Sequence, residues 1–149
     1  MSMSHSKTLS VVIVNYKTPK LCLDCLDSIY QDDATNAEIL IVDNHSNDSS
    51  VEIISRSFGE HNRYRKRIIC SDVNAGFSAG NNIGIKESSA DFILLLNSDT
   101  IVRLDAIDLL LQSLIDNPNI GMASPRLEWP DGKPQESCFR FHRPINELI

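Results

Sequence analysis

The sequence predicts an α/β fold with three layers, α/β/α, in which helices cover both faces of a mostly parallel sheet. Short apolar runs alternate with helical patterns along the chain, which is typical of βαβ units with right-handed crossovers. Residues 92–96 are apolar at every position, as expected of a strand that is buried on both faces of a parallel sheet. A chain of 149 residues is long enough to bury one hydrophobic core, so a single domain is expected.

Apolar runs separated by polar turns are expected to form the strands. Aliphatic and β-branched residues dominate these runs, and such side chains suit a pleated surface. The run at residues 9–15 is the first, and the fully apolar run described above is the fourth. The expected strands are residues 9–15, 38–42, 67–71, 91–96 and 120–123.

Capping and breaking residues define the limits of the expected helices. Thr18 offers an N-cap, and Pro19 suits the first helical position. Asp48 or Ser49 can cap the second helix. Apolar residues recur at helical spacing in the last helix, which ends before Pro118. The expected helices are residues 19–30, 51–58, 77–88 and 104–116.

The two ends of the chain are expected to lie outside the alternating strands and helices. Residues 1–8 are expected to form a flexible N-terminus ahead of one domain at residues 9–149. Pro-Asp-Gly-Lys at 130–133 is a strong turn signal, so residues 126–141 are expected to form a hairpin or an extended excursion. A domain of this class that stops soon after a fifth strand is incomplete, so we expect a truncated domain.

The composition argues against several classes of protein. The net charge of −6 disfavours a nucleic-acid binder, which would carry a basic stripe. No apolar stretch approaches the roughly 20 residues that cross a bilayer. Cys22 and Cys25 form a C-x-x-C on an expected helix, but without a second such pair they are interpreted as small buried residues. Nothing indicates a disulfide framework, so a reducing, cytoplasmic compartment is expected.

Two polar turns follow apolar runs at the edge of the sheet where ligands bind in open α/β folds. Asp99 follows the fourth strand, and a carboxylate there can hold a divalent cation together with the phosphates of a ligand. The alternative is that Ser98, Asp99 or Thr100 only caps the next helix. Asp43 ends the second expected strand, where an acidic residue often accepts hydrogen bonds from a ribose or a base.

Residues 74–84 are rich in glycine, alanine and asparagine. Small residues let a backbone approach a ligand closely, and the N-terminus of a helix favours anions. No G-x-G-x-x-G follows the first strand, which disfavours a dehydrogenase. No G-x-x-x-x-G-K-[ST] occurs, which excludes the P-loop nucleoside triphosphatases.

Taken together, these segments resemble the N-terminal, donor-binding half of a family-2 glycosyltransferase, closest to the bacterial rhamnosyltransferase-like branch. The segments that carry the resemblance are residues 11–16, 41–48, 74–77 with 81–84, 94–100, and 124–127 with 131–132. The resemblance implies the Rossmann-like nucleotide-diphospho-sugar transferase fold, known as GT-A. It also implies transfer of a sugar from a nucleotide-diphospho-sugar, with dTDP-rhamnose as one candidate donor, to a glycan or lipid-linked acceptor.

The same resemblance implies roles for individual residues. Asn97, Ser98 and Asp99 stand where the family has a D-x-D motif, and Asp99 would hold Mg²⁺ or Mn²⁺ against the diphosphate. Val14 and Tyr16 would line the base pocket. The implied nucleotide-sugar-binding residues are Val14, Asn15, Tyr16, Asp43, Asn74, Gly76, Asn82, Asn97 and Ser98.

The catalytic base is expected to be missing from this chain. Members of the family invert the configuration of the sugar with a carboxylate base that lies in the later, acceptor half. Glu128 and Asp131 match the family's strand-and-turn segment and not its base. We therefore expect the chain alone to be inactive or weakly active. The face left by the missing half is expected to promote self-association, and the full-length protein to work in the cytoplasm at the inner face of the membrane.

Two alternatives stay open at this point. The chain could be a nucleotide-binding or interaction module that keeps the fold without the chemistry. It could also be a sugar nucleotidyltransferase, although the glycine-rich, basic loop that such enzymes carry after the first strand is missing from Asn15-Tyr16-Lys17-Thr18-Pro19.

Overall fold

Four parallel strands form one sheet in the order β3-β2-β1-β4. The computed structural model describes residues 8–31, 37–58 and 64–136. The strands are β1 (Leu9–Asn15), β2 (Ala37–Asp43), β3 (Arg65–Cys70) and β4 (Phe92–Asn97). The helices are α1 (Pro19–Gln31), α2 (Ser50–Ser57), α3 (Phe77–Glu87) and α4 (Ala106–Asp116). These elements confirm the expected α/β class, and their limits lie close to those predicted from the sequence.

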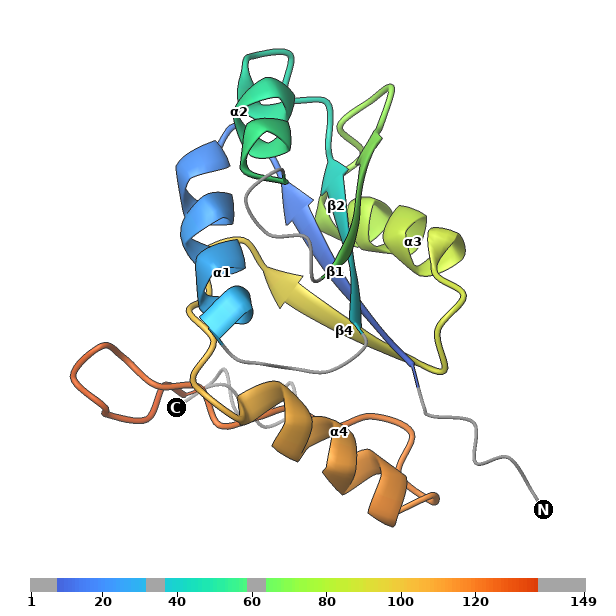
Figure 1. The fold of residues 1–149 in the computed structure, drawn as a ribbon, viewed down its shortest axis with the longest axis vertical. Helices are drawn as coiled ribbons and strands as arrows, with labels where there is room; N and C mark the ends of the chain where they lie inside the picture. The colour runs from blue at the N-terminus through green and yellow to red at the C-terminus, as the bar shows by residue number, and fades with distance from the viewer. Residues whose placement is uncertain (1–7, 32–36, 59–63, 137–149) are drawn as a thin grey trace, which may run out of the picture.

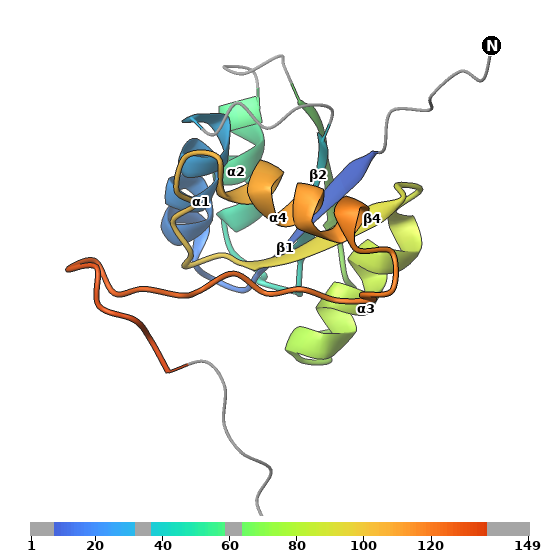
Figure 2. The ribbon, with the colours of Figure 1, turned by 90° about the horizontal axis from the view of Figure 1, so that it is seen from below.

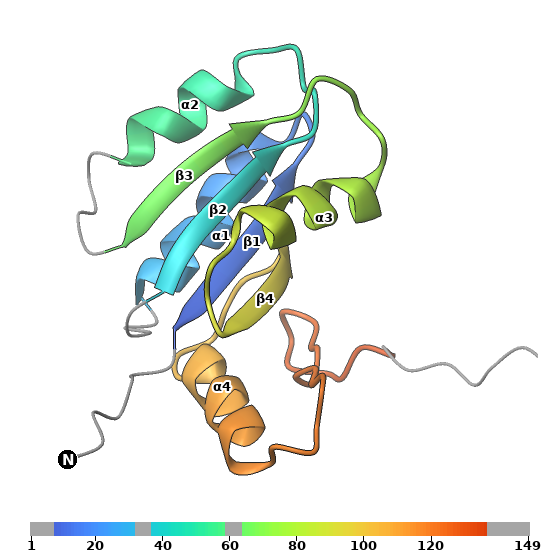
Figure 3. The same ribbon diagram turned by 90° about the vertical axis from the view of Figure 1, so that its right-hand side faces the viewer.

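The helices lie on both faces of the sheet, which confirms the three-layer arrangement (Figure 1). Helices α1 and α2 cover one face, and α3 lies across the opposite face over β1 and β2 (Figures 2 and 3). Helix α4 joins the first layer, because its Ile107 belongs to the same core cluster as the side chains of α1 and α2. In the part of the chain that the structure describes, no helix is long and apolar enough to span a bilayer.

The core is divided by the sheet into two unequal parts. The larger part lies between the sheet and α1, α2 and α4, and contains Leu26, Ile29 and Ile54 with no exposed surface. The smaller part lies under α3 and is built on Val12 and Leu40. Strand β1 is buried along its whole length because both layers cover it. The residues at its carboxyl end are therefore held on a rigid support.

Two glycines let α3 pack directly on β1. A Cβ atom at Gly84 would lie 2.3 Å from Cγ1 of Val12, and one at Gly80 would lie 2.8 Å from Cγ1 of Val14. These positions are one helical turn apart and therefore share the face of α3 that meets the sheet. The small residues of this segment predict, from the sequence alone, a close approach between the backbone and a ligand. At Gly80 and Gly84, the close approach is instead between helix and strand.

Strand β4 is not buried on both faces, which corrects the expectation for residues 92–96. It forms an edge of the sheet and pairs only with β1 among the described strands. Its residues alternate between half-buried and exposed, and Ile93 and Leu95 are 39% and 47% exposed. The reason is that α3 packs over β1 and β2 and leaves this face of β4 uncovered.

The expected fifth strand at residues 120–123 does not form, and this prediction was wrong. The chain after α4 continues as an extended, mostly exposed segment to residue 136 (Figure 2). Its one pairing is an antiparallel bridge between Glu128 and Pro134. The expected turn is present there, since the Gly132 N–H donates to Trp129 O at 2.8 Å and Gly132 has a φ of 82°. Residues 137–141 of the expected hairpin lie outside the described residues.

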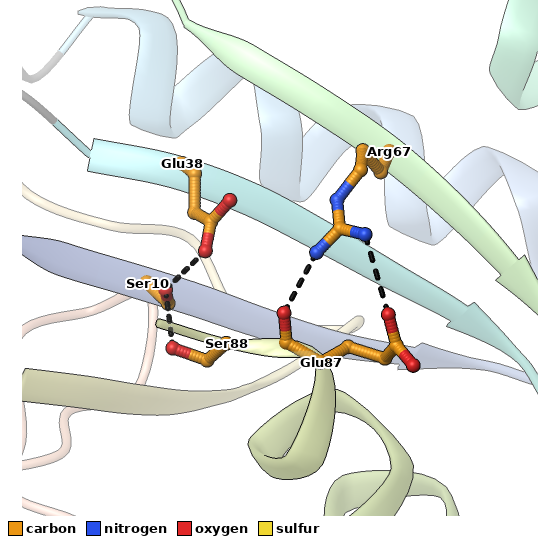
Figure 4. Close-up of polar contacts among 5 residues, drawn as sticks. All are labelled: Ser10, Glu38, Arg67, Glu87 and Ser88. Carbon is orange, nitrogen blue, oxygen red and sulfur yellow. Dashed lines mark hydrogen bonds and ion pairs between the residues drawn. The ribbon is translucent and has the colours of Figure 1, made fainter. Parts of the chain in front are cut away.

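A set of polar contacts ties α3 to the amino-terminal part of the sheet (Figure 4). Ser88 Oγ donates to Ser10 Oγ at 2.6 Å, and Ser10 Oγ donates to Glu38 Oε1 at 2.7 Å. Arg67 donates to the backbone oxygen of Glu87 at 2.7 Å and pairs with its carboxylate at 3.3 Å. These contacts link β1, β2 and β3 to the end of α3, on the side of the sheet away from the strand ends that carry the predicted site.

Candidate functional site

An open cleft lies at the carboxyl ends of β1, β2 and β4, which is the edge of the sheet where the sequence predicts a ligand. It consists of two adjoining hollows, one of about 300 Å³ and the other of about 310 Å³. Both hollows are lined by Val14, Thr18, Phe77 and Ser98. The first also reaches Leu21, Asn97 and Asp99, and the second also reaches Tyr16, Asn44 and Asn74. The cleft therefore has an amide-rich end, lined by Asn44 and Asn74, and an end lined by the Asp99 carboxylate.

The register of the sheet brings these ends together. Asn15 of β1 lies opposite Asp43 of β2, and Val14 of β1 lies opposite Asn97 of β4. Three strands therefore finish at nearly the same level, and the turns that follow them meet at one edge of the sheet. This is the edge at which parallel α/β sheets bind ligands.

Asp43 lies inside the protein with its carboxylate already engaged. Its side chain is 4% exposed. Oδ1 accepts hydrogen bonds from Asn15 Nδ2 at 2.8 Å and from Ser46 Oγ at 2.6 Å, and Oδ2 accepts one from the Ser46 N–H at 3.0 Å. Ser46 Oγ in turn accepts from the Lys17 N–H at 3.0 Å. The carboxylate thus joins the turns after β1 and β2 from beneath the cleft.

A second set of hydrogen bonds orients Asn44 toward the loop before α3. Its Nδ2 donates to Asn74 Oδ1 at 2.8 Å and to Gly76 O at 3.2 Å, and Asn74 Oδ1 also accepts from the Gly76 N–H at 3.0 Å. Gly76 has a φ of 89°, which favours glycine. Lys17 also has positive φ, 57°, in the turn after β1. Hydrogen bonds within the protein therefore fix the turns on the amide-rich side of the cleft.

The segment Asn97-Ser98-Asp99-Thr100 forms a tight turn at the end of β4. The Thr100 N–H donates to Asn97 O at 3.1 Å, which closes the turn. Helix α4 begins only at Ala106, after an N-cap at Asp105. The alternative reading, in which Ser98, Asp99 or Thr100 caps the next helix, is therefore wrong. The exposed Asp99 lines the cleft instead.

The residues at this turn fit a divalent cation that is shared with a bound diphosphate. Mg²⁺ commonly binds through one or two carboxylates, with waters and phosphate oxygens completing its shell. Asp99 supplies one carboxylate at the rim of the cleft. The described residues contain no group of three or more metal-binding side chains, so they form no closed cage of their own. A ligand that brings its own phosphate oxygens would complete such a site.

The structure gathers most of the predicted site residues around the cleft. Those that line it are Val14, Tyr16, Asn74, Asn97, Ser98 and Asp99. Asn15 and Asp43 are buried beneath it, and the Gly76 carbonyl is bonded to Asn44. Asn82 is exposed on α3 and does not line either hollow, whereas its neighbour Asn81 is buried.

Four lining residues were not predicted as site residues: Leu21, Thr18, Phe77 and Asn44. Asn44 directly follows Asp43 at the end of β2, so the strand-end rule extended by one position would have found it. Phe77 follows the predicted Gly76 but is the first residue of α3, where no strand ends. Thr18 was predicted as a helix cap, and it directly precedes α1, where its backbone oxygen accepts from the Cys22 N–H at 3.1 Å. Its hydroxyl donates to Asn15 Oδ1 at 3.4 Å. Leu21 gave no signal, because an apolar residue on a helix predicts core packing.

Among the described residues, the late carboxylates and the paired cysteines do not form a second reactive centre. Arg126 and Arg103 both pair with Glu128, and they lower the pKa of this carboxyl. Lys133 pairs with Asp131 at 2.7 Å and lowers the pKa of that carboxyl. Burial raises the pKa of Cys22 and of Cys25 to about 12, so both thiols keep their protons at neutral pH. The interpretation of the C-x-x-C as two small buried residues is confirmed.

The comparisons with known proteins agree with this fold. Residues 10–137 match the family described as glycosyl transferase family 2. The match covers most of the sequence, and the chain therefore belongs to that family. The family-level resemblance stated from the sequence is confirmed.

One relative and two solved structures illustrate the similarity. The glycosyltransferase GlyG of Streptococcus pneumoniae serotype 4 is 31% identical over 109 residues, which cover 73% of this chain and 36% of GlyG. The mannosyltransferase PcManGT of Pyrobaculum calidifontis, solved with GDP-Man and Mn²⁺, superposes with a TM-score of 0.71 at 18% identity, over 76% of this chain and 34% of that one. S. aureus TarS 1-349 with UDP-GlcNAc gives a TM-score of 0.66 at 19% identity, over 74% and 32% of the two chains.

These similarities establish a GT-A type of fold for the chain. They also define its extent, because the chain spans about a third of the length of each of these three proteins.

Proposed function

We propose that this chain binds the nucleotide-diphospho-sugar donor of a glycosyltransferase, with a divalent cation held by Asp99. The observation that supports the proposal is the position of Asp99 on a tight turn at the rim of a cleft shared by β1, β2 and β4. The two solved relatives described above contain GDP-Man with Mn²⁺ and UDP-GlcNAc, so the fold accommodates this class of ligand in those proteins.

The two hollows suit the two ends of such a donor. Tyr16, Asn44 and Asn74 would contact the nucleoside, since an aromatic ring and amides provide stacking and hydrogen bonds to a base or ribose. Asn97, Ser98 and Asp99 would lie against the diphosphate. The cation, Mg²⁺ or Mn²⁺, would neutralise the diphosphate as it leaves. Because Asn97 adds no negative charge, Asp99 carries the cation contact of this turn.

The chain would supply the donor site of a transfer to a glycan or lipid-linked acceptor with inversion at the sugar carbon. Inversion needs a base that removes the proton of the acceptor hydroxyl. Among the described carboxylates, Asp99 alone lines the cleft, and we assign it to the cation. We propose that the base lies outside the described residues. If instead the full protein lacks such a base, the chain is a nucleotide-binding module, which is the second candidate function.

Calorimetric titration tests the donor site. We expect binding of at least one of UDP, dTDP, GDP or dTDP-rhamnose that strengthens when Mn²⁺ is present. Asp99→Ala should remove this strengthening, because the cation loses its protein ligand. Asp72→Ala, which removes another exposed carboxylate, should leave it unchanged. Failure of every nucleotide to bind, with and without Mn²⁺, would overturn the proposal.

We also propose that the chain associates with itself through β4. The strand has an unpaired edge among the described strands, and Ile93 and Leu95 are exposed beside it. Apolar surface of this kind favours association.

We place the reaction in the cytoplasm, at the inner face of the membrane. The cysteines Cys22, Cys25 and Cys70 are free, which suits a reducing compartment. Recovery of the full protein in an extracellular fraction would contradict this placement.

A further inference from the structure

Helix α1 holds both ends of the loop that carries Asp99. At the first end, Cys25 Sγ lies 3.7 Å from the backbone oxygen of Asn97 and donates to it. At the second end, the Val102 N–H donates to Ser28 Oγ at 2.9 Å. Cys25 and Ser28 are three residues apart and therefore share one face of the helix. The residues between the two anchored positions include Ser98 and Asp99, which line the cleft.

Each anchor adds a hydrogen bond between α1 and a backbone group of the loop. The Asn97 oxygen accepts from the Thr100 N–H inside the turn, and the thiol of Cys25 donates to the same oxygen from the helix. Ser28 Oγ donates to Cys25 O at 2.6 Å, which directs a lone pair of the hydroxyl to the Val102 N–H. Ser28 is 7% exposed and Cys25 is fully buried, so water does not compete strongly for these bonds.

We propose that Cys25 and Ser28 are positioning residues, which fix the loop at residues 97–102 so that Asp99 faces the cleft. This inference rests on the proposed function for the role of Asp99, but the two hydrogen bonds from α1 to the loop do not depend on that function. Neither side chain lines the cleft, so neither touches the ligand. They act by keeping the loop at residues 97–102 ordered. A cation ligand on a freely moving loop would bind more weakly, because binding would have to immobilise it.

Cys22 provides a matched control on the same helix. It is as fully buried as Cys25 and its thiol pKa is raised to the same value, about 12. Among the described residues, no hydrogen bond joins Cys22 to the loop at 97–102. Cys22→Ala and Cys25→Ala therefore remove the same atom from the same core, and only the second removes an anchor.

Two measurements test the proposal on the 149-residue chain. The first is hydrogen exchange at the Val102 amide. Loss of one hydrogen bond corresponds to about a fivefold change in an equilibrium constant, so Ser28→Ala should speed this exchange by about that factor. The second is the gain in nucleotide affinity on addition of Mn²⁺. Ser28→Ala and Cys25→Ala should each reduce this gain about fivefold. Cys22→Ala should alter neither the exchange rate of Val102 nor the gain in affinity with Mn²⁺.

The outcomes separate this inference from the proposed function. If Val102 exchanges as slowly in Ser28→Ala as in the unchanged chain, the anchor at Ser28 is overturned, whatever the nucleotide does. If Cys22→Ala reduces the Mn²⁺ effect as much as Cys25→Ala, the role of Cys25 is overturned. If no nucleotide binds the unchanged chain but Val102 exchange still rises in Ser28→Ala, the anchor stands and the proposed function fails. Ser28→Cys, which fills the site with a thiol and weakens the acceptor, repeats the exchange measurement should the alanine variant unfold.

Discussion

At the scale of single residues, the carboxylate of Asp43 organises the cleft without facing it. It accepts hydrogen bonds from Asn15 and from two donors of Ser46, and it is almost completely buried. A buried acceptor of this kind is expensive to alter, because its donors would lose their partners away from water. Asp43 therefore shapes the cleft through the turns that it joins.

Asp43→Asn should lower the free energy of unfolding by about 1–3 kcal/mol. The amide replaces an accepting oxygen with an NH₂ group, which would face a donor of Asn15 or Ser46. Urea denaturation of the Asp43→Asn variant and of the unchanged chain measures the difference in the free energy of unfolding. Asp72→Asn, at an exposed position, is the control and should leave the midpoint unchanged. Equal stability of Asp43→Asn and the unchanged chain would show that the network contributes little.

The sequence predicted where Asp43 lies but not how it is used. Its place directly after an apolar run set it at the end of a strand, and the structure agrees. Its partners could not be predicted in the same way. Asn15 becomes its neighbour only through the pairing of β1 with β2, and Ser46 reaches back through a turn in which His45 has a φ of 63°. Positive φ at a residue other than glycine leaves no clear mark in a sequence.

At the scale of secondary-structure elements, the contact between α3 and β1 determines how α3 sits above the strand ends. Gly80 and Gly84 bring the helix backbone against Val14 and Val12. The loop at residues 74–76 precedes this helix and borders the cleft. A change in the height of α3 above the sheet would therefore move one wall of the cleft.

Gly84→Ala should destabilise the protein by about 1–3 kcal/mol, the usual range for overpacking. The added Cβ would lie 2.3 Å from Val12 Cγ1, so the helix or the strand must shift. The gain in helix propensity, about 1 kcal/mol, offsets only part of this cost. Thermal unfolding measures the effect, with Gly121→Ala as control because nothing lies within 4 Å of its added Cβ. A more stable Gly84→Ala chain would show that α3 has room to move.

The elements themselves could be predicted because each has a strong local signal. Pro19 is the first residue of α1, as its fixed φ predicts, and the helical spacing of apolar residues located α4. The failures concern tertiary partners. Residues 120–123 are apolar enough for a strand, but a strand needs a neighbour, and β4 has none beyond β1 among the described residues.

At the scale of the whole molecule, the sheet is covered unequally. Among the described helices, α1, α2 and α4 pack on one face and α3 packs on the other, so the outer strand β4 keeps one open face. The sequence could not reveal this. A wholly apolar run predicts that both faces are covered, but it does not say by what.

Self-association should depend on β4. We expect the apparent mass of the chain in light scattering to rise with concentration, and Leu95→Lys to reduce this rise, because a charge on an edge strand opposes pairing. Leu109→Lys is the control, since Leu109 is 69% exposed on α4 and the substitution changes the net charge equally. A chain that stays monomeric at all concentrations would contradict the proposal.

The polar contacts of Figure 4 lie at the opposite end of the sheet from the cleft. Ser10, Glu38 and Ser88 join the strands and α3 there, and none of them lines the cleft. These contacts hold the strands and α3 together without using the side chains that line the cleft. A substitution at Tyr16 could therefore change the proposed nucleoside contact while these distant contacts keep the architecture intact.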